Sequence, residues 1–232
     1  MATSAKHISR KELRQPDRFM VLTQKALDFA REKRTLLIIL GALTAAVLIV
    51  IAAVQVYKGN QNEQAAGYFE KALTLYRADK HDEAIAEFEK VQAYRWSRYA
   101  AIAHLYEANS HLATNNLERA RTAAQRFVAA TDQNSLYRQI GLVTLGHIEE
   151  SRAQCQEAIQ HYTAAERIPA ALKEAALLGK ARCLTAVGDN PSAIATYQQY
   201  IKENPNTPTS TRLILKVAEI QAASGEPQAA VK

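Results

Sequence analysis

Three side chains that could bind a metal recur at helical spacing near the middle of the chain. His104, Glu107 and His111 are separated by three and four residues, which places them on one face of a helix because one turn takes about 3.6 residues. Imidazole and carboxylate groups can together hold a transition metal. The alternative is that both histidines fill packing positions between helices, and we favour it. We therefore predict neither a metal nor any other cofactor.

Motifs of catalysis are missing from the sequence. Gly141 and Gly146 have the spacing of a phosphate-binding loop, but His147 and Ile148 follow where a lysine and a hydroxyl residue are required. There is no nucleophile elbow, dinucleotide-binding fingerprint or zinc-protease helix. We predict a protein that is not an enzyme, without catalytic or cofactor-binding residues.

The elements that carry these residues are predicted to be helices. Ala, Leu, Glu, Gln, Lys and Arg dominate the composition, whereas the 232 residues include only 8 Gly and 6 Pro. Such a balance favours an all-α fold.

Residues 35–57 form an uncharged run of 23 residues. As a helix it would be about 34 Å long, which exceeds the roughly 30 Å of a hydrocarbon core. The run is longer than the apolar core of a cleaved signal peptide, and Ala52-Ala53-Val54-Gln55 is a poor cleavage site. We therefore predict a single transmembrane helix. Gly41 and Ala45 have the spacing of a helix-dimerisation motif, so a homodimer is an alternative to a monomer.

The positive charge of the chain is concentrated before this run. Nine Lys/Arg and four acidic residues precede Thr35, a net charge of +5, and the region after Tyr57 has only +1. The positive-inside rule explains this excess better than nucleic-acid binding does, and it predicts a cytoplasmic N-terminus. Residues 17–34 are either an amphipathic surface helix or the start of one continuous membrane helix; the absence of a helix breaker favours the second. With no glycosylation acceptor in the sequence, we expect a bacterial inner-membrane protein with a periplasmic domain.

Beyond Tyr57 the chain repeats itself. Four segments align on a small residue early in a second helix, and each is preceded by a helical stretch and a short polar turn. These small residues are Ala84, Ala120, Ala158 and Ala193. They are 36, 38 and 35 residues apart. A repeat of this length is typical of stacked helical hairpins.

This pattern resembles the tetratricopeptide repeat, a helix–turn–helix unit with small and aromatic residues at fixed positions. The resemblance extends from Ala65 to Pro205. Its residues are Ala72, Ala84 and Phe88 in the first repeat; Leu142, Leu145, Gly146, Ala158 and Tyr162 in the third; and Ala181, Gly188, Asp189, Ala193, Tyr197 and Pro205 in the fourth. The second repeat departs from it, because Ala124 stands where an aromatic residue is expected.

The resemblance implies an α-solenoid of about four hairpins whose first helices line a protein-binding groove. The expected lining is Phe69, Leu73, Tyr76, Leu105, Asn109, Leu112, Val143, His147, Leu178 and Arg182. Such a groove suits an extended or helical segment of another protein. Burial of part of this lining by the superhelix is the alternative.

A cluster of aromatic and basic residues follows the first repeat. Tyr94, Arg95, Trp96, Arg98 and Tyr99 could contact a partner, since rings and arginines together stack on peptides or bases. They also fall at the junction of two repeats, where rings fill the gap, and we favour this packing role.

The chain has two cysteines. We expect Cys155 at the start of the third repeat's second helix and Cys183 near the end of the fourth repeat's first helix. These helices are antiparallel neighbours, so a disulfide is an option in an oxidising compartment. Two small buried residues that never meet are the alternative.

The whole arrangement resembles the ancillary SecYEG translocon subunit family, with a short cytoplasmic segment, one membrane helix and a periplasmic repeat domain. The resemblance implies an adaptor that assists protein export or chaperoning and binds the translocon, exported chains or periplasmic chaperones. A scaffold for cell division or pilus assembly is the alternative. The predicted segments are a basic cytoplasmic and juxtamembrane part (1–34), the membrane helix (35–57), a linker (58–64), the repeats (65–207), a capping helix (208–224) and a tail (225–232).

Overall fold

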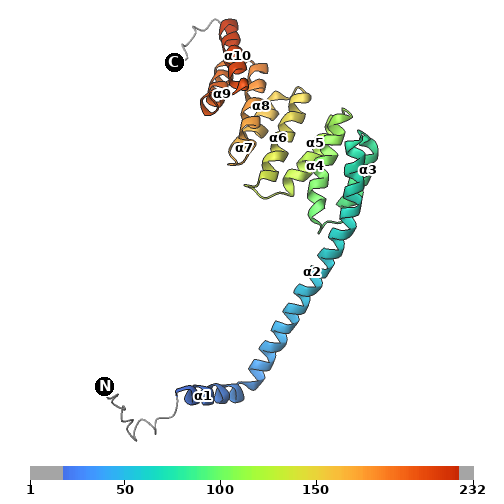
Figure 1. Ribbon diagram of the computed structural model, residues 1–232, viewed down its shortest axis with the longest axis vertical. Coiled ribbons are helices and arrows are strands. Elements are labelled where there is room, and N and C mark those ends of the chain that lie inside the picture. Colours follow the sequence, from blue (N-terminus) through green and yellow to red (C-terminus); the bar gives the residue numbers. More distant parts are fainter. Residues whose placement is uncertain (1–17, 225–232) are drawn as a thin grey trace, which may run out of the picture. The chain divides into compact units, whose positions relative to one another are not determined.

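The structure, a computed structural model, describes residues 18–224. It divides into two compact units at the bond between Tyr57 and Lys58. The described residues form ten helices, in agreement with the predicted all-α fold (Figure 1). They are α1 (Arg18–Glu32), α2 (Arg34–Arg77), α3 (His81–Gln92), α4 (Arg98–Ala113), α5 (Leu117–Ala129), α6 (Leu136–Ser151), α7 (Cys155–Glu166), α8 (Lys173–Ala186), α9 (Asn190–Glu203) and α10 (Pro208–Ser224). Parts of the predicted N-terminal segment and all of the predicted tail lie outside the described residues.

The N-terminal unit contains α1 and the first part of α2. A turn at Lys33 separates the two helices, so the preferred prediction of one continuous helix from residue 17 is wrong. The pattern of side chains changes at this turn: α1 mixes polar residues with exposed apolar ones such as Phe19 and Phe29, whereas residues 35–57 carry no charge. An amphipathic helix suits an environment that is polar on one side and apolar on the other, whereas a uniformly apolar helix suits apolar surroundings on all sides. By length and composition, α2 is one helix that could cross a membrane.

The expected polar linker at residues 58–64 is helical. It lies inside α2, which continues to Arg77, so the structure corrects the prediction of a separate connecting segment. The segment lacks proline, and Gln and Glu are good helix formers. The conformational entropy cost of its single glycine, Gly59, is too small to end the helix.

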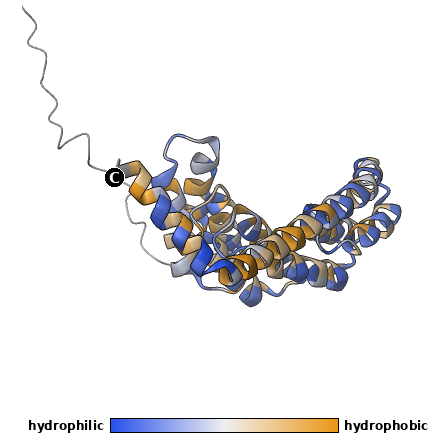
Figure 2. Cartoon of the chain, turned by 90° about the horizontal axis from the view of Figure 1, so that it is seen from below, coloured by the Kyte–Doolittle hydropathy of each residue, from blue (hydrophilic) through white to orange (hydrophobic). Residues whose placement is uncertain are grey.

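The second unit is a stack of helical hairpins. Helices α4–α5, α6–α7 and α8–α9 form antiparallel pairs, and α3 pairs with the last turns of α2 (Figure 1). Hydrophobic and hydrophilic residues are mixed along the helices (Figure 2). The small residues that defined the repeats are buried, because helices can approach closely only where side chains are small. The buried small residues are Ala72, Ala84, Ala108, Ala120, Gly146, Ala158, Ala181 and Ala193.

The turn inside each hairpin has one residue with a positive φ. These residues are Asp79 (58°), Asn115 (57°), Ala153 (59°) and Gly188 (83°). In every turn the next N–H donates to a carbonyl five residues earlier, as from Lys80 to Leu75 at 3.0 Å. This is the Schellman motif, which satisfies the last carbonyls of a helix and reverses the chain.

In the second repeat, an aromatic residue about one helical turn later takes the place of the missing one. Ala124 is fully buried, and Phe127, three residues later, is buried too. A Cβ added at Gly141 of α6 would lie 2.9 Å from the Phe127 ring. Phe127 therefore does in this repeat what Phe88 and Tyr162 do in others.

Helix α10 occupies the segment expected for the capping helix. The Ser210 N–H donates to the Thr207 hydroxyl at 3.1 Å, which satisfies one of the amides at the start of the helix. Val217 and Ile220 then pack against Tyr197 of α9. Because α10 covers this apolar surface, the last hairpin does not leave its core open to water.

Candidate functional site

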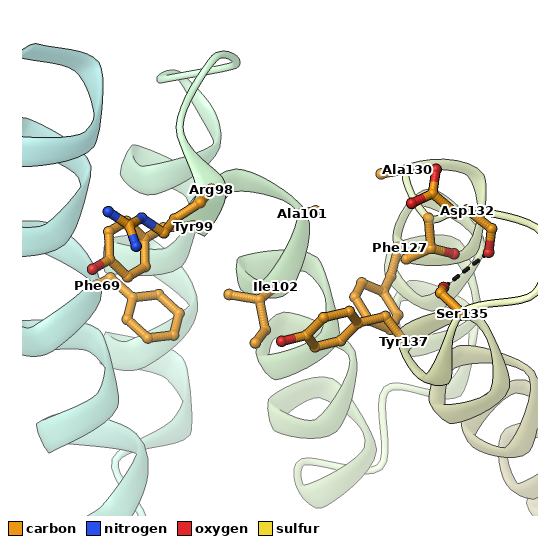
Figure 3. A pocket seen from close by; sticks show the side chains of 11 residues that line it. Phe69, Arg98, Tyr99, Ala101, Ile102, Phe127, Ala130, Asp132, Ser135 and Tyr137 are labelled. Atoms are coloured by element: carbon orange, nitrogen blue, oxygen red, sulfur yellow. Dashed lines mark hydrogen bonds between the residues drawn. The ribbon is translucent and has the colours of Figure 1, made fainter. Parts of the chain in front are cut away.

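A cleft of about 400 Å³ lies between α2, α4 and the connection from α5 to α6 (Figure 3). Its lining is mainly apolar and aromatic. The residues that shape it most are Phe69, Tyr99, Ile102, Phe127 and Tyr137. Concave apolar sites of this size are typical of ligand and peptide binding.

One wall of the cleft is made by Phe69 of α2 and Tyr99 of α4. Their ring centroids are 5.3 Å apart. Phe69 is held from behind by Phe88 at 5.8 Å and Tyr106 at 5.7 Å, both in edge-on arrangements. Edge-on contacts between rings are favourable beyond the area they bury, so this wall is fixed before any partner arrives.

The opposite wall is made by Phe127 and Tyr137, which pack edge to face with centroids 6.5 Å apart. Phe127 is buried, whereas 54% of Tyr137 is exposed. Ala101 and Ile102 of α4 form the floor between the walls (Figure 3). The Ile102 side chain stands between the two walls, and the neighbouring alanine adds little volume (Figure 3).

Polar groups lie at the rim of the cleft. Arg98 is exposed on one side and Asp132 on the other. The Ser135 hydroxyl donates to the Asp132 carbonyl at 2.8 Å and accepts from the Arg138 N–H at 3.1 Å, which fixes the loop that enters α6. The arrangement can bury an apolar side chain between the walls while the rim pairs with polar groups of the same segment.

Of the ten groove residues predicted from the sequence, Phe69 lines this cleft. Tyr76 instead packs edge to face against Tyr106 at 5.3 Å and against His81 at 5.5 Å. Leu73, Leu105 and Asn109 are half-buried and His147 is exposed. Leu112, Val143 and Leu178 pack on the cores between neighbouring helices. None of these eight residues lines the cleft.

Arg182, the cation predicted in the groove, is bound within the chain. Its guanidinium donates to both oxygens of Glu150, each at 2.8 Å, and the Tyr162 hydroxyl donates to the same carboxylate at 2.9 Å. Burial opposes the ionisation of Glu150, but the bonds from Arg182 and Tyr162 outweigh it and hold the pKa of this carboxyl below its usual value. This ion pair therefore joins α6 to α8.

The candidate metal face is a hydrogen-bonded packing site. The Glu107 carboxylate accepts from Gln92 at 2.6 Å and lies 3.4 Å from the ring Nδ1 of His104. Burial lowers the pKa of His111, whose Nε2 is 3.9 Å from Glu107. Among the described residues no group of three or more His, Cys, Asp or Glu is arranged to hold a metal.

The structure brings the two cysteines together. Cys155 is the first residue of α7 and Cys183 lies near the end of α8, with their Sγ atoms 2.9 Å apart. No bond joins the two sulfur atoms in the structure; Cys183 is buried and Cys155 is partly exposed. The predicted juxtaposition is present, and the disulfide itself stays a prediction.

The aromatic–basic cluster divides between the two roles considered for it. Tyr94 and Tyr99 pack against the core of the first hairpin. Trp96, Arg95 and Arg98 are exposed, and Arg98 also lines the cleft. The sequence therefore contained one half of the cleft. Its other half was missed, although Phe127 and Tyr137 stand where the second repeat departs from the pattern.

Comparison with known proteins supports the repeat assignment. Residues 69–135 and 175–207 each match a family model described as tetratricopeptide repeat. A comparison with proteins of curated function finds no significant match.

Solved structures with the same fold have low sequence identity to this chain. The crystal structure of YrrB, a TPR protein with an unusual peptide-binding site, is 16% identical with a TM-score of 0.57, covering 73% of this chain and 82% of YrrB. MamA is 17% identical with a TM-score of 0.57, covering 66% of this chain and 84% of MamA. PilF of Pseudomonas aeruginosa is 15% identical with a TM-score of 0.57, covering 72% of this chain and 71% of PilF. Two stretches of the helical stack therefore match the tetratricopeptide repeat, and these solved structures share the fold of the stack.

Proposed function

We propose that this chain is a membrane-anchored adaptor that captures segments of other proteins in the cleft between α2, α4 and the start of α6. The observation that carries the proposal is the cleft itself, with two aromatic walls on either side of Ala101 and Ile102. Aromatic pockets at the centre of an interface supply most of its binding energy. The peptide-binding site of YrrB, a protein of the same fold, supports the same kind of ligand.

The segment that fits the cleft is an extended peptide with one large apolar or aromatic side chain. That side chain would enter between Phe69 and Tyr137, and its rings or methyl groups would replace water on both walls. Arg98 and Asp132 have opposite charges at the rim, so they favour a peptide with polar groups on either side of the apolar one.

The anchor is the uncharged first part of α2. Its side chains are exposed in the structure, including Leu48 and Ile49, and an apolar surface of this length is stable in a bilayer and unstable in water. The charge of +5 before Thr35 supports a cytoplasmic N-terminus. The exposed apolar residues of α1, among them Phe19 and Leu22, suit a helix that lies on the membrane surface.

We place the repeats in the bacterial periplasm and propose the Sec translocon, exported chains or periplasmic chaperones as partners. Topology is tested by adding protease to spheroplasts: the repeats should be digested while the N-terminal segment is protected. Digestion of the N-terminal segment with protection of the repeats would reverse the orientation.

Site-specific photo-crosslinking tests the cleft. A benzophenone amino acid at Ile102, on the floor, should crosslink partner proteins in native membranes. The same probe at Leu136, which is 46% exposed and outside the lining, is the matched control. Tyr137→Ser should reduce crosslinking at Ile102 roughly tenfold because it removes one wall, whereas Leu136→Ser should not. Equal crosslinking at both positions contradicts the cleft.

The identity of the crosslinked proteins separates the two cellular roles. Translocon subunits, exported chains or chaperones would support the export adaptor. Components of the division or pilus machinery would instead support a scaffold and overturn the export role, while leaving the cleft as the binding site.

A further inference from the structure

An exposed tryptophan lies beside the residue where the second unit begins. Trp96, the single tryptophan of the chain, sits in the connection from α3 to α4 and is 60% exposed. The Nζ of Lys58 is 5.5 Å from the centroid of its ring. Together with the exposed Arg95 these residues are called the Trp96 patch below.

The connection that carries the patch is fixed to α2. The Arg98 N–H donates to the Asn62 side-chain oxygen at 2.9 Å, and the Ser97 hydroxyl accepts from the Tyr99 N–H at 3.1 Å. The first bond ties the connection to α2, and the second caps the start of α4. Trp96 is therefore held near residues 58–62, although most of its ring is exposed.

The composition of the patch is that of a membrane–water interface. Trp rings prefer the headgroup level because they are apolar with one polar N–H. Lys58 and Arg95 add positive charge, and the sequence has no acidic residue from Val91 to Tyr106. Cations close to a bilayer surface are attracted to anionic lipids.

The position of the patch follows from its contact with Lys58. That residue directly follows Tyr57, the end of the uncharged run, so in a spanning helix it must lie at the edge of the hydrocarbon core. Asn62 is four residues further on, or about 6 Å along the helix, and the polar layer of each leaflet is roughly 5–8 Å thick. Trp96, which lies beside Lys58 and on the connection bonded to Asn62, therefore lies close to this layer.

We infer that the Trp96 patch binds the lipid surface, with the Trp96 ring at the headgroup–acyl boundary and with Arg95 and Lys58 on lipid phosphates. The first hairpin is thereby held against the membrane that anchors it. This inference rests on the proposed anchor at residues 35–57 and adds to it a second membrane contact, made by the repeats.

The fluorescence of Trp96 tests the inference, because no other tryptophan contributes. The full chain is reconstituted into vesicles of phosphatidylcholine and phosphatidylglycerol and recovered by flotation. Lipids brominated near the headgroup should quench the emission at least about twofold, and iodide in the buffer should quench it weakly. Arg95→Gln should reduce the extra quenching that phosphatidylglycerol gives over phosphatidylcholine alone.

A displaced tryptophan is the matched control. The variant Trp96→Phe with Leu215→Trp moves the ring to α10, at the other end of the stack, where Leu215 is 64% exposed (Figure 1). Its emission should be quenched by iodide and not by brominated lipid.

The outcomes separate the inference from the anchor. Flotation without lipid quenching overturns the inference alone, whether Trp96 is then open to iodide or covered by protein. Failure to float overturns the anchor and the inference with it. Flotation with lipid quenching in the native chain, absent in the α10 control, supports both.

Discussion

The first two hairpins and the last two pack the same backbone in different ways. Between α2 and α5, rings fill the space between neighbouring helices, with Phe69, Phe88 and Tyr106 in mutual contact. Between α6 and α9, glycines let the helices approach: a Cβ at Gly146 would lie 2.6 Å from the Tyr162 ring, and a Cβ at Gly179 would also overlap it. Rings hold first helices apart, and glycines bring them together.

This difference explains where the cleft is. The large volume of the rings leaves a hollow between α2, α4 and α6. At the other end α6 and α8 are in direct contact, and Arg182 of α8 is bound to Glu150 of α6. The position of the cleft thus depends on the packing residues between repeats as much as on the exposed ones.

Tyr162→Ala should have the largest effect on the free energy of unfolding, since it removes the ring around which the last two hairpins pack. The side chain is 1% exposed, and truncation of a buried aromatic residue costs about 3–5 kcal/mol. Tyr137→Ala, in the cleft wall, should cost roughly 0.5 kcal/mol or less because its ring is half in solvent. Urea unfolding of the full chain in detergent measures both. Equal losses would contradict the distinction between packing rings and cleft rings.

Oxidation of the two cysteines should stabilise the last two hairpins and not the first two. A disulfide between Cys155 and Cys183 would close a loop of 28 residues and stabilise the chain by roughly 3–4 kcal/mol in the entropy model. Burial and the contact with Cys155 raise the pKa of the Cys183 thiol, so reaction with an added disulfide oxidant should begin at Cys155.

Thiol counting decides whether this bridge forms. Denatured, unreduced protein from the cell envelope should show no free thiols, and two would disprove the bridge. The variant Cys155→Ser is the control, since it should gain no stability from the oxidant.

Two glycine substitutions should have opposite signs. Gly179→Ala forces a methyl group against the Tyr162 ring, and overpacking of this kind costs about 1–3 kcal/mol. Gly67→Ala, in α2, meets nothing within 4 Å and should stabilise the helix by roughly 0.5–1 kcal/mol. Thermal unfolding monitored by circular dichroism compares them. A neutral Gly179→Ala would show that α8 does not need its close approach.

The pH dependence of stability should come from both the first two hairpins and the last two. Burial lowers the pKa of His111 in α4 and of His161 in α7 below the ordinary value of 6.5. The unfolded chain therefore binds more protons than the folded chain as pH falls below 6.5, and stability should decrease. His111→Gln and His161→Gln should each remove part of the decrease between pH 7.5 and 5. If neither variant flattens it, the buried histidines are not its source.

The hairpins and their turns could be predicted from the sequence because they depend on neighbours along the chain. Ala84, Ala158 and Ala193 mark helix contacts by size alone, and the polar turns at residues such as Asn115 and Gly188 follow directly. The break at Lys33 could not be predicted, since no proline or glycine marks it.

The cleft was less accessible to sequence reasoning. Which side of a first helix faces solvent depends on the angle between repeats, and that angle depends on ring packing several residues away. Tyr76, which was expected in the groove, packs against Tyr106 and does not line the cleft. The useful signal was the irregular second repeat: where Ala124 replaces a ring, Phe127 supplies one and also builds the cleft.

The Schellman turns have a consequence for how the chain acquires its structure. Each turn is closed by hydrogen bonds within six residues, and each helix from α3 to α10 packs on the next one along the chain. Contact order is therefore low, and folding can start in any hairpin and spread to its neighbours without a search for distant segments. A polypeptide with this property can fold hairpin by hairpin as it emerges from a narrow exit, before its C-terminus is available.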